Sequence, residues 1–392
     1  MQKHGGVLGG SLLVAGTTIG GGMLALPVLT SPAGFIPAIA IYVLCWLFMT
    51  CTGLLFLELA LAMESEANIV TMAEKTLGWP GKLFAWMVYL FLFYCLTLAY
   101  IVGLGNLLSS LLPSYLTPSL GPVFVVVIFA PFIYVGTKLV GKLNIFLVAG
   151  LIFFYFCFVF IGAPWVKKEL LEERNWSLSL FALPIAFTSF AYQGTIPTLV
   201  SYLDRNAKNL RKSIILGSLI PLVTYVIWQG LILGIVPYEG EGGLASTLEQ
   251  GQNAVYPLKN FIGNPQIYLI GQYFAFFALL TSFFGVTLGL LDFLSDSLKI
   301  KKTAKGKFLL CSLLFLPPLV IGLIYPHVFL QALDYAGGYG CALLLGLLPI
   351  LMIWKLRYHQ NNQHYIQLPG GKLVLGCLLL FVFFELIVAY LI

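Results

Sequence analysis

Long apolar runs alternate with short polar connections along the whole 392-residue chain. A helix that crosses a bilayer needs roughly 20 predominantly apolar residues, and eleven runs approach or exceed that length. The sequence therefore predicts an all-α polytopic membrane protein in which residues 1–392 form a single transmembrane domain. The predicted spans cover residues 7–29, 35–62, 83–111, 122–138, 143–162, 180–203, 213–236, 266–297, 308–325, 329–354 and 372–391.

The first predicted span is interrupted at its centre by small and polar residues. Thr17 and Thr18 are followed after one residue by three consecutive glycines, Gly20–Gly22. Each glycine in a helix interior costs about 1 kcal/mol relative to alanine. Unwound backbone is tolerated inside a membrane only where it is buried in protein or lines a polar cavity. We therefore expect a break that contributes to a substrate site, with close helix packing through small residues as the alternative.

The sixth predicted span repeats this peculiarity. It carries four polar or small residues between two prolines, namely Thr188, Ser189, Gln193 and Gly194 between Pro184 and Pro197. Proline weakens the helical hydrogen-bond ladder, so ordinary proline kinks are one explanation. Interruptions at corresponding positions of two halves instead indicate inverted repeats with the substrate between the broken helices. We expect repeats over 7–162 and 180–354, followed by an extra eleventh helix over 372–391.

Composition and charge support a membrane protein and restrict its function. Hydrophobic residues make up 60% of the chain and charged residues 9%, whereas soluble domains have about 25% charged residues. The net charge of +6 has no basic stripe interleaved with aromatic residues, so nucleic acid is not an expected partner. We find no carboxylate pair placed for acid–base catalysis, no phosphate-binding loop and no metal motif. The chain is not expected to be an enzyme or to hold a cofactor.

The basic residues are distributed unevenly among the connections. With the N-terminus in the cytoplasm, all but four of the 21 Lys and Arg residues, Lys3 included, lie on the cytoplasmic side. The exceptions are Lys167, Lys168, Arg174 and Lys259. Cytoplasmic connections of membrane proteins are enriched in Lys and Arg. We therefore expect a cytoplasmic N-terminus and, with an odd number of spans, an external C-terminus.

Four segments carry a resemblance to a known family. They are Ala15–Pro27, Phe187–Gly194, Val200–Asp204 and Gly285–Asp296. The chain resembles the hydroxy/aromatic amino acid permeases, the tyrosine-specific and tryptophan-specific transport proteins of bacteria, within the amino acid–polyamine–organocation superfamily. The resemblance implies a LeuT-like 5+5 inverted repeat with discontinuous helices 1 and 6, and import of L-tyrosine or L-tryptophan across the inner membrane. One departure is visible, because members of the family often have His where this chain has Gln193.

An amino acid substrate would need three kinds of contact. Its carboxylate would accept from backbone N–H groups at Gly20–Gly22, and its ammonium would donate to carbonyls near 15–18 and 189–191. Its ring would lie against Phe190 and Tyr192, with Tyr94, Tyr100 and Phe277 as further candidates. The candidate substrate-binding residues are Ala15, Gly16, Thr17, Thr18, Gly20, Gly21, Gly22, Ser189, Phe190, Ala191, Tyr192, Gln193, Tyr94, Tyr100 and Phe277.

The coupling ion has two interpretations. Thr281 and Ser282 resemble the hydroxyl pair that binds sodium in sodium-coupled LeuT-like transporters, together with carbonyls near Ala15 and Thr18. Helical Ser and Thr often bond only to their own backbone. Some proton-coupled relatives place a lysine in span 5, and residues 143–161 contain none. Proton symport, usual for the bacterial permeases, is our first interpretation, and a sodium-coupled symporter or an exchanger is the alternative.

Ionisable residues inside the spans are rare, and each is a candidate for function. Glu58 and Asp292 are candidates for a proton carrier or for a cytoplasmic gate that pairs with Arg205 or Arg211. For Glu385 in span 11 and Asp296 we expect buried ion pairs or interfacial snorkelling, and Asp334 lies near the external end of span 10. A channel is less well supported, because no span has a polar stripe along its full length. The expected partners are an aromatic amino acid and membrane lipids.

Overall fold

The computed structural model describes residues 6–63, 67–111, 120–360 and 364–391, and every regular element in these ranges is a helix. Lys3, which contributes to the charge asymmetry, lies outside them. The first half contains α1 (Val7–Thr18), α2 (Gly22–Thr30), η1 (Ser31–Ala33), α3 (Phe35–Ala62), α4 (Ile69–Leu77), α5 (Trp79–Leu111), α6 (Gly121–Val135), α7 (Thr137–Gly162) and η3 (Ala163–Trp165). The second half contains α8 (Lys168–Leu171), η4 (Trp176–Ala182), α9 (Leu183–Ser189), η5 (Gln193–Thr195), α10 (Ile196–Tyr202), α11 (Ala207–Ile235), α12 (Leu244–Glu249), α13 (Leu258–Phe261), α14 (Pro265–Ser297), α15 (Ala304–Ile324), α16 (Phe329–Tyr335), η6 (Ala336–Leu347), α17 (Leu348–Tyr358) and α18 (Gly371–Leu391).

Each of the eleven predicted spans contains helix. Among the described residues, eight helical segments are long and apolar enough to cross a membrane, and α1 with α2 forms a ninth that is bent by 58°. The fourth span is the shorter helix α6, and the sixth is divided between α9 and α10, which have seven residues each. The sequence therefore locates the spans, and it also locates the two that are discontinuous.

Some predicted boundaries were wrong. Span 5 was expected to begin at residue 143, but α7 begins at Thr137 and includes Lys138 and Lys142 in its first turns. Gly136, with a φ of 114°, ends α6 and turns the chain directly into α7. Only glycine adopts this backbone conformation readily, so two helices meet where the hydropathy pattern indicated a charged loop.

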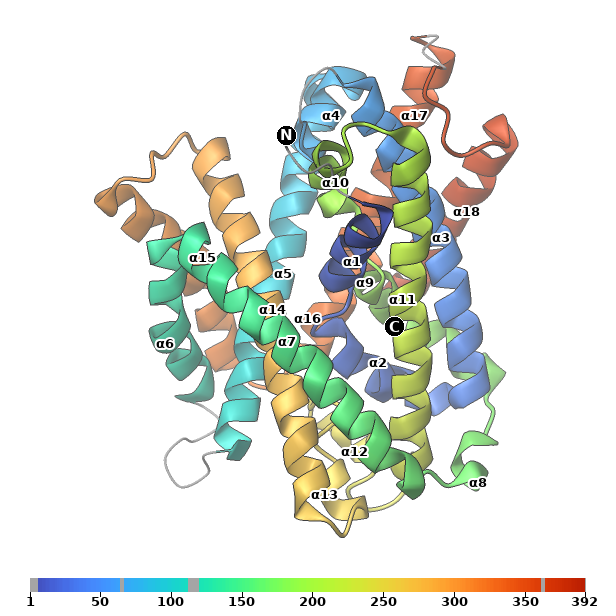
Figure 1. Ribbon diagram of the computed structural model, residues 1–392, viewed down its shortest axis with the longest axis vertical. Helices are drawn as coiled ribbons and strands as arrows, with labels where there is room; N and C mark the ends of the chain where they lie inside the picture. The colour runs from blue at the N-terminus through green and yellow to red at the C-terminus, as the bar shows by residue number, and fades with distance from the viewer. Residues whose placement is uncertain (1–5, 64–66, 112–119, 361–363, 392) are drawn as a thin grey trace.

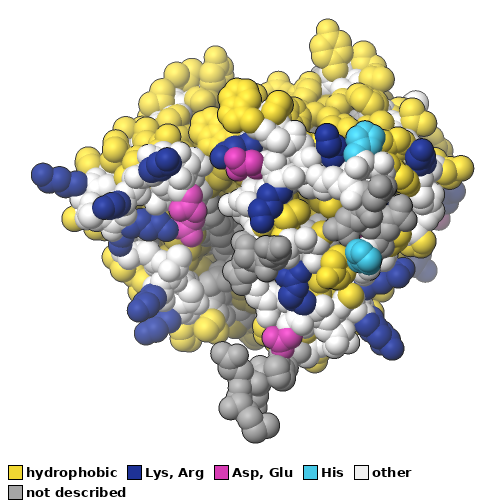
Figure 2. All heavy atoms as spheres, turned by 90° about the horizontal axis from the view of Figure 1, so that it is seen from above, with side chains coloured by type: hydrophobic (Ala, Val, Ile, Leu, Met, Phe, Trp, Pro, Cys, Tyr) yellow, Lys and Arg dark blue, Asp and Glu magenta, His cyan; other side chains and the backbone are white. Residues whose placement is uncertain are grey.

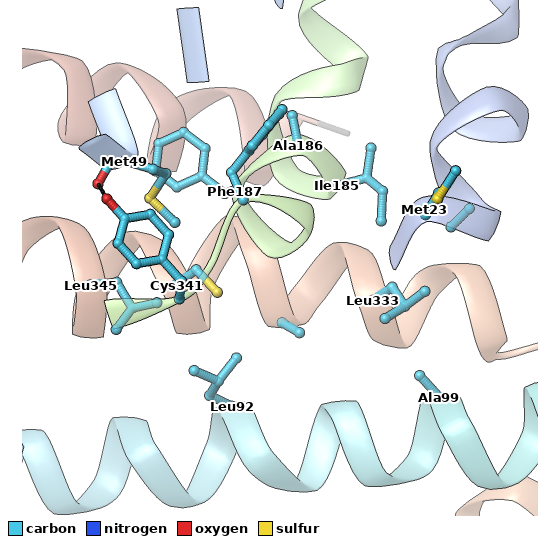
Figure 3. Close-up of a cluster of buried hydrophobic side chains, with 14 of the residues drawn as sticks. Met23, Met49, Leu92, Ala99, Ile185, Ala186, Phe187, Leu333, Cys341 and Leu345 are labelled. Carbon is cyan, nitrogen blue, oxygen red and sulfur yellow. Dashed lines mark hydrogen bonds between the residues drawn. The ribbon is translucent and has the colours of Figure 1, made fainter. Parts of the chain in front are cut away.

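The helices form one bundle in which the discontinuous helices lie at the centre (Figure 1). α1 packs along α11, and α9 packs between α2 and the long helix formed by α16, η6 and α17. Figure 3 shows Ile185 of α9 between Phe187 of the same helix and Met23 of α2, with Leu333 and Cys341 of the long helix below them. These side chains are fully buried or nearly so, so the ends of α9 are fixed by packing on both sides.

The connections divide between the two ends of the bundle as the charge pattern predicts. The α6–α7, α10–α11, α14–α15 and α17–α18 connections lie at one end, and α8, α12 and α13 lie at the other (Figure 1). Figure 2 views the first end and shows Lys and Arg side chains spread over it, with few acidic ones. We call this end the basic face and the other end the opposite face.

Candidate functional site

The break in the first span exposes backbone between two short helices. α1 ends at Thr18 and α2 begins at Gly22. The Gly21 N–H donates to Ser282 Oγ on α14 at 2.9 Å. The N–H groups of Gly20 and Gly22 have no partner among the described residues. A Cβ on Gly20 would lie 2.2 Å from Ser282 Oγ, so glycine is required here by close approach.

The break in the sixth span is held by a side chain. α9 ends at Ser189, and the chain runs through η5 before α10 begins at Ile196. Gln193 Oε1 accepts from the Tyr192 N–H at 2.9 Å, while Gln193 Nε2 donates to Met49 O at 3.2 Å and to Thr52 Oγ1 at 3.1 Å. The Tyr192 hydroxyl also donates to Met49 O, the bond drawn in Figure 3. One amide therefore pairs with the Tyr192 N–H and fastens the unwound segment to α3.

A tyrosine that sequence reasoning missed joins the two breaks. Tyr225 on α11 is fully buried, and its hydroxyl lies 2.8 Å from Thr18 O and 2.9 Å from Ser189 O. These carbonyls end α1 and α9, where no following helical N–H is available to them. With 20 tyrosines in the chain, no local signal distinguished this one.

A cavity of about 430 Å³ lies between the breaks. Its volume is within the range of small-molecule sites, about 300–1,000 Å³. It brings together most of the predicted site residues, namely Gly16, Thr17, Thr18, Gly20, Gly22, Tyr100, Ser189, Ala191, Tyr192, Gln193, Thr281 and Ser282. Two tyrosines, polar hydroxyls and bare backbone thus line one space.

Other predicted residues do not line this cavity. Phe190 packs against Tyr225 and Tyr42, and Phe277 stacks on Phe154. The Tyr94 hydroxyl donates to Leu313 O on α15. Ala15 and Gly21 are also absent from the lining. Aromatic residues are so frequent in this chain that composition gave no means of separating pocket from core.

The cavity extends from the breaks toward the basic face. Tyr89 and Phe93 on α5, Asn144 on α7 and Gly289 on α14 line it, and each lies in the half of its helix nearer that face. Sequence reasoning missed these residues, although the i, i+4 spacing of Tyr89 and Phe93 puts both rings on one helix face. On the opposite side, the Ala254 N–H donates to Leu24 O, so the segment between α12 and α13 covers α2.

The hydroxyl pair on α14 is engaged within the protein. Thr281 Oγ1 donates to Phe277 O at 2.9 Å and to Ala278 O at 3.1 Å, within its own helix. Ser282 Oγ accepts from the Gly21 N–H. Within the described ranges, no group of three or more His, Cys, Asp or Glu side chains is arranged to hold a metal.

The predicted partners of Glu58 and Asp292 were wrong. Glu58 forms a buried ion pair with Arg357, with Arg357 Nη2 2.6 Å from Glu58 Oε2, and it also accepts from the Gln367 N–H. Asp292 pairs at 2.7 Å with Lys302 in an exposed position. Arg205 donates instead to the carbonyls of Leu61 and Met63, which the charge pattern did not indicate.

The expectation for Glu385 was also wrong. Glu385 is fully buried, and neither of its carboxyl oxygens has a hydrogen-bond partner in the described part of the chain. It therefore neither snorkels to the interface nor forms an ion pair. An ion pair was expected because an unpaired buried charge is costly, but the helices around α18 bring no cation to this position.

Two discontinuous helices facing each other across a central cavity define a secondary transporter of the LeuT-like fold. Solved structures share this fold: a crystal structure of MhsT in complex with L-phenylalanine has a TM-score of 0.66 at 16% identity and covers 98% of both chains. A manganese transporter of Eremococcus coleocola has a TM-score of 0.62 at 14% identity, over 98% of this chain and 85% of the transporter. The predicted all-α 5+5 inverted-repeat fold with discontinuous helices 1 and 6 is thereby confirmed.

The chain belongs to the tryptophan/tyrosine permease family, whose model matches residues 3–389. It is 36% identical to tyrosine-specific transport system 1 of Haemophilus influenzae, over 94% of this chain and 92% of that protein. It is 30% identical to the tryptophan-specific transport protein of the same organism, over 97% and 94%. The family is one of transport proteins, so this chain is a multi-pass membrane transporter and not an enzyme.

Proposed function

We propose that this protein imports L-tyrosine or L-tryptophan across the bacterial inner membrane by proton symport, through alternating access. The observation that carries the proposal is the 430 Å³ cavity between the two breaks. Backbone N–H groups without partners lie at one side of this cavity, and tyrosine rings form part of its wall. The named substrates of the similar transport proteins support the same class of substrate.

The cavity offers a distinct place for each part of an aromatic amino acid. The Gly20 and Gly22 N–H groups at the start of α2 suit the carboxylate, because a helix N-terminus attracts anions. Ser189 Oγ is buried without a partner among the described side chains and lies next to Gly22. The rings of Tyr100 and Tyr192 line the same space and suit the aromatic side chain.

Proton coupling is supported by the engagement of the oxygen atoms that a sodium ion would use. Thr18 O accepts from the Tyr225 hydroxyl, Ser282 Oγ accepts from the Gly21 N–H, and Thr281 Oγ1 bonds to its own helix. A sodium ion prefers hard oxygen ligands and would have to compete with these bonds. The single observation that favours sodium is that Thr281 and Ser282 both line the cavity beside the first break.

The charge asymmetry supports an orientation with the basic face in the cytoplasm, the N-terminus cytoplasmic and the C-terminus external. In this orientation the cavity extends toward the cytoplasm, and the segment between α12 and α13 covers its external side. The conformation is then the one that releases substrate inward. The repeat boundaries 7–162 and 180–354, and residues 372–391 as the extra helix, stay predictions.

The test is uptake of labelled tyrosine, tryptophan, phenylalanine and leucine into proteoliposomes, under an imposed proton gradient or an imposed sodium gradient. We expect tyrosine or tryptophan to accumulate under an inward proton gradient without sodium, and a protonophore to abolish the accumulation. Accumulation that needs sodium and survives collapse of the proton gradient would contradict proton symport. The double variant Thr281→Ala with Ser282→Ala should then lose sodium dependence.

A further inference from the structure

Two acidic side chains outside the substrate cavity have no counter-ion. Both carboxyl oxygens of Glu385 on α18 are buried without a partner among the described residues, and so is Oδ1 of Asp334 on α16. The ion pairs of the described chain join other residues, namely Glu58, Glu74 and Asp292 with their basic partners. Ionisable residues inside a membrane are costly to keep and commonly functional.

The surroundings of Glu385 favour a bound proton. An ionised carboxylate in an apolar interior without a hydrogen-bond donor is strongly disfavoured, whereas the protonated carboxyl is tolerated. The Glu385 side chain has an exposed fraction of 0% and receives no hydrogen bond from the described residues. The chemistry of this position therefore points to a proton as its ligand in this conformation.

The two carboxyls are placed between two cavities. Asp334 lines a second cavity, of about 530 Å³, at the opposite face of the bundle. On the other side, Cys341 of η6 lines the substrate cavity. α18, which carries Glu385, packs against η6, and the Tyr339 hydroxyl bonds to Ala389 O across this contact. Glu385 thus lies on a helix that packs against the helix running from one cavity to the other.

The packing of η6 against α18 fixes the positions of Asp334 and Glu385 along the long axis of the bundle. A Cβ on Gly338 would lie 2.7 Å from Ala389 Cβ, so η6 and α18 are in close contact there, and the Tyr339 hydroxyl donates to Ala389 O. The two helices run in opposite directions. Asp334 therefore lies one turn from this contact toward the opposite face, and Glu385 lies one turn toward the bundle centre.

The carboxyl pair is mechanically connected to the substrate site through α9. Thr188 Oγ1 donates to Leu333 O, next to Asp334, at 2.7 Å. A Cβ on Gly337 would lie 1.7 Å from Pro184 O, so α9 and η6 are in direct backbone contact, as the position of Leu333 and Cys341 beside α9 in Figure 3 indicates. α9 ends at Ser189 in the substrate cavity. A charge placed at this interface acts on the sixth-span break.

We propose that Asp334 and Glu385 form the proton-binding pair through which the external proton gradient acts on the substrate site; this inference rests on the proton symport proposed above. A hydronium ion in the 530 Å³ cavity gives a proton to an Asp334 carboxylate oxygen and leaves water. In this conformation the two carboxyls share no hydrogen bond. The proton passes to Glu385 when α18 and the helix formed by α16 and η6 shift and bring the carboxyls, or a bridging water, within hydrogen-bond distance; this transfer restores the Asp334 carboxylate. Protonated Glu385 permits α9, η6 and α18 to close together, and its carboxylate form holds them apart.

Other titratable groups face this pair from the neighbouring elements. Cys341 on η6 and Cys45 on α3 are buried thiols, and α9 contributes no titratable side chain. Around Asp334 the cavity is lined by Glu249, Tyr325, His327, Tyr335 and Tyr339. This lining contains no Lys or Arg, and the His327 ring is bonded through Nδ1 to Gln250 O.

The experiment compares two activities in the same proteoliposomes. Counterflow of labelled substrate at equal pH on both sides needs no net proton movement, whereas accumulation under a pH gradient does. One pH unit at one proton per substrate corresponds to about tenfold accumulation. We expect Glu385→Gln to retain counterflow, to accumulate no substrate, and to lose the substrate-induced acidification that a pH dye reports inside the vesicles.

Two variants complete the design. Asp334→Asn should slow substrate-induced proton entry by about 100-fold, the lower end of what loss of one proton-transfer group costs, with counterflow again retained. The matched control is Glu74→Gln on α4, an exposed carboxyl paired with Lys82, which should couple substrate accumulation to proton entry as the wild type does.

Coupled accumulation in Glu385→Gln overturns the proposal. Loss of counterflow in both Glu385→Gln and Asp334→Asn also overturns it, because exchange requires no proton site.

The measurements on the wild-type protein distinguish a failure of the carboxyl-pair proposal from a failure of proton symport, on which it rests. If the wild-type protein accumulates substrate without proton entry, proton symport and the carboxyl pair fail together. If the wild-type protein couples to protons and Glu385→Gln still does, only the assignment of the pair fails.

Discussion

The two breaks occupy corresponding positions in the two halves, yet their backbone is satisfied in different ways. In the first break, glycines leave the Gly20 and Gly22 N–H groups without partners, and only Gly21 is bonded, to Ser282. In the second break, the Gln193 side chain bonds to the Tyr192 N–H and to α3. The Tyr225 hydroxyl bonds to one backbone carbonyl at each break, Thr18 O and Ser189 O.

The difference assigns different tasks to the two breaks. The Gly20 and Gly22 N–H groups at the start of α2 in the first break are free to bind a carboxylate, whereas in the second break the Gln193 side chain bonds to the Tyr192 N–H and anchors the segment to α3. A buried polar group left unpaired costs about 1–3 kcal/mol, so a carboxylate bound at Gly20 and Gly22 relieves that cost. We therefore expect substitutions in the second break to reduce stability, and substitutions in the first to reduce substrate binding.

The largest expected effect is that of Gln193→Leu. It leaves the Tyr192 N–H without its partner, while Met49 O and the Thr52 hydroxyl each lose one bond and keep another, so the free energy of unfolding should fall by about 2–3 kcal/mol. Thermal unfolding in detergent measures this loss. Gln193→His is the comparison, because an imidazole keeps one donor and one acceptor and should lose less. A Leu variant as stable as the wild type would remove the proposed difference between the breaks.

Gly20→Ala should have the next largest effect, and it should act on binding. The added methyl group would lie 2.2 Å from Ser282 Oγ, and overpacking of this kind costs about 1–3 kcal/mol. Substrate affinity, measured as the half-saturation constant of counterflow, should weaken about tenfold or more. Gly141→Ala on α7 has open space around its Cβ, does not line the cavity, and serves as the matched variant with little change. Equal losses in both would contradict the assignment.

Tyr225→Phe tests the connection between the breaks. It removes one hydroxyl from two buried carbonyls, and the expected loss of stability is about 1 kcal/mol or slightly more. Tyr155→Phe is the control, since its hydroxyl bonds to Thr224 O away from both breaks. The informative readout is transport rate, because the Tyr225 hydroxyl bonds to both helices that end at the cavity. Indistinguishable rates in the two variants would mean that the link has no role in transport.

The smallest expected effects are those of Thr281→Val and Ser282→Ala. Thr281→Val removes a hydroxyl that bonds to its own helix and should change the apparent affinity by less than about twofold. Ser282→Ala leaves the Gly21 N–H unpaired and should cost about 1 kcal/mol. Counterflow measured with and without sodium shows whether the Thr281 and Ser282 hydroxyls contribute to sodium binding. A loss of sodium stimulation in both variants would favour the sodium-coupled alternative.

The fold was largely accessible from sequence because its strongest signals are local. Apolar runs located the spans, and Gly20–Gly22 and Pro184 to Pro197 marked the interrupted ones, since glycine and proline directly oppose a continuous helix. The α6–α7 boundary was not accessible, because a single glycine with positive φ at Gly136 replaced the expected loop. Hydropathy averages over too many residues to detect such a turn.

The sequence predicted the candidate site only where interrupted backbone forms it. Gly16, Gly20, Gly22, Ser189, Tyr192 and Gln193, all named from the sequence, line one cavity, whereas Gly21 does not. Tyr225, Tyr89 and Asn144 were missed, because their roles depend on which helix faces they occupy in the bundle. For the same reason Phe190 and Phe277 were placed in the pocket but pack in the core. Contacts between distant helices set these outcomes, and spacing along the chain does not encode them.

The buried Glu58–Arg357 pair has a consequence for how the protein is made. Glu58 enters the membrane with α3, whereas its partner lies 299 residues further along the chain. At a synthesis rate of about 5–20 residues per second, the carboxyl waits about 15–60 s for its cation. A nascent chain that stops before Arg357 retains an unneutralised acid in an apolar helix. The Glu58–Arg357 contact therefore forms late in synthesis, after nearly all of the chain has been made.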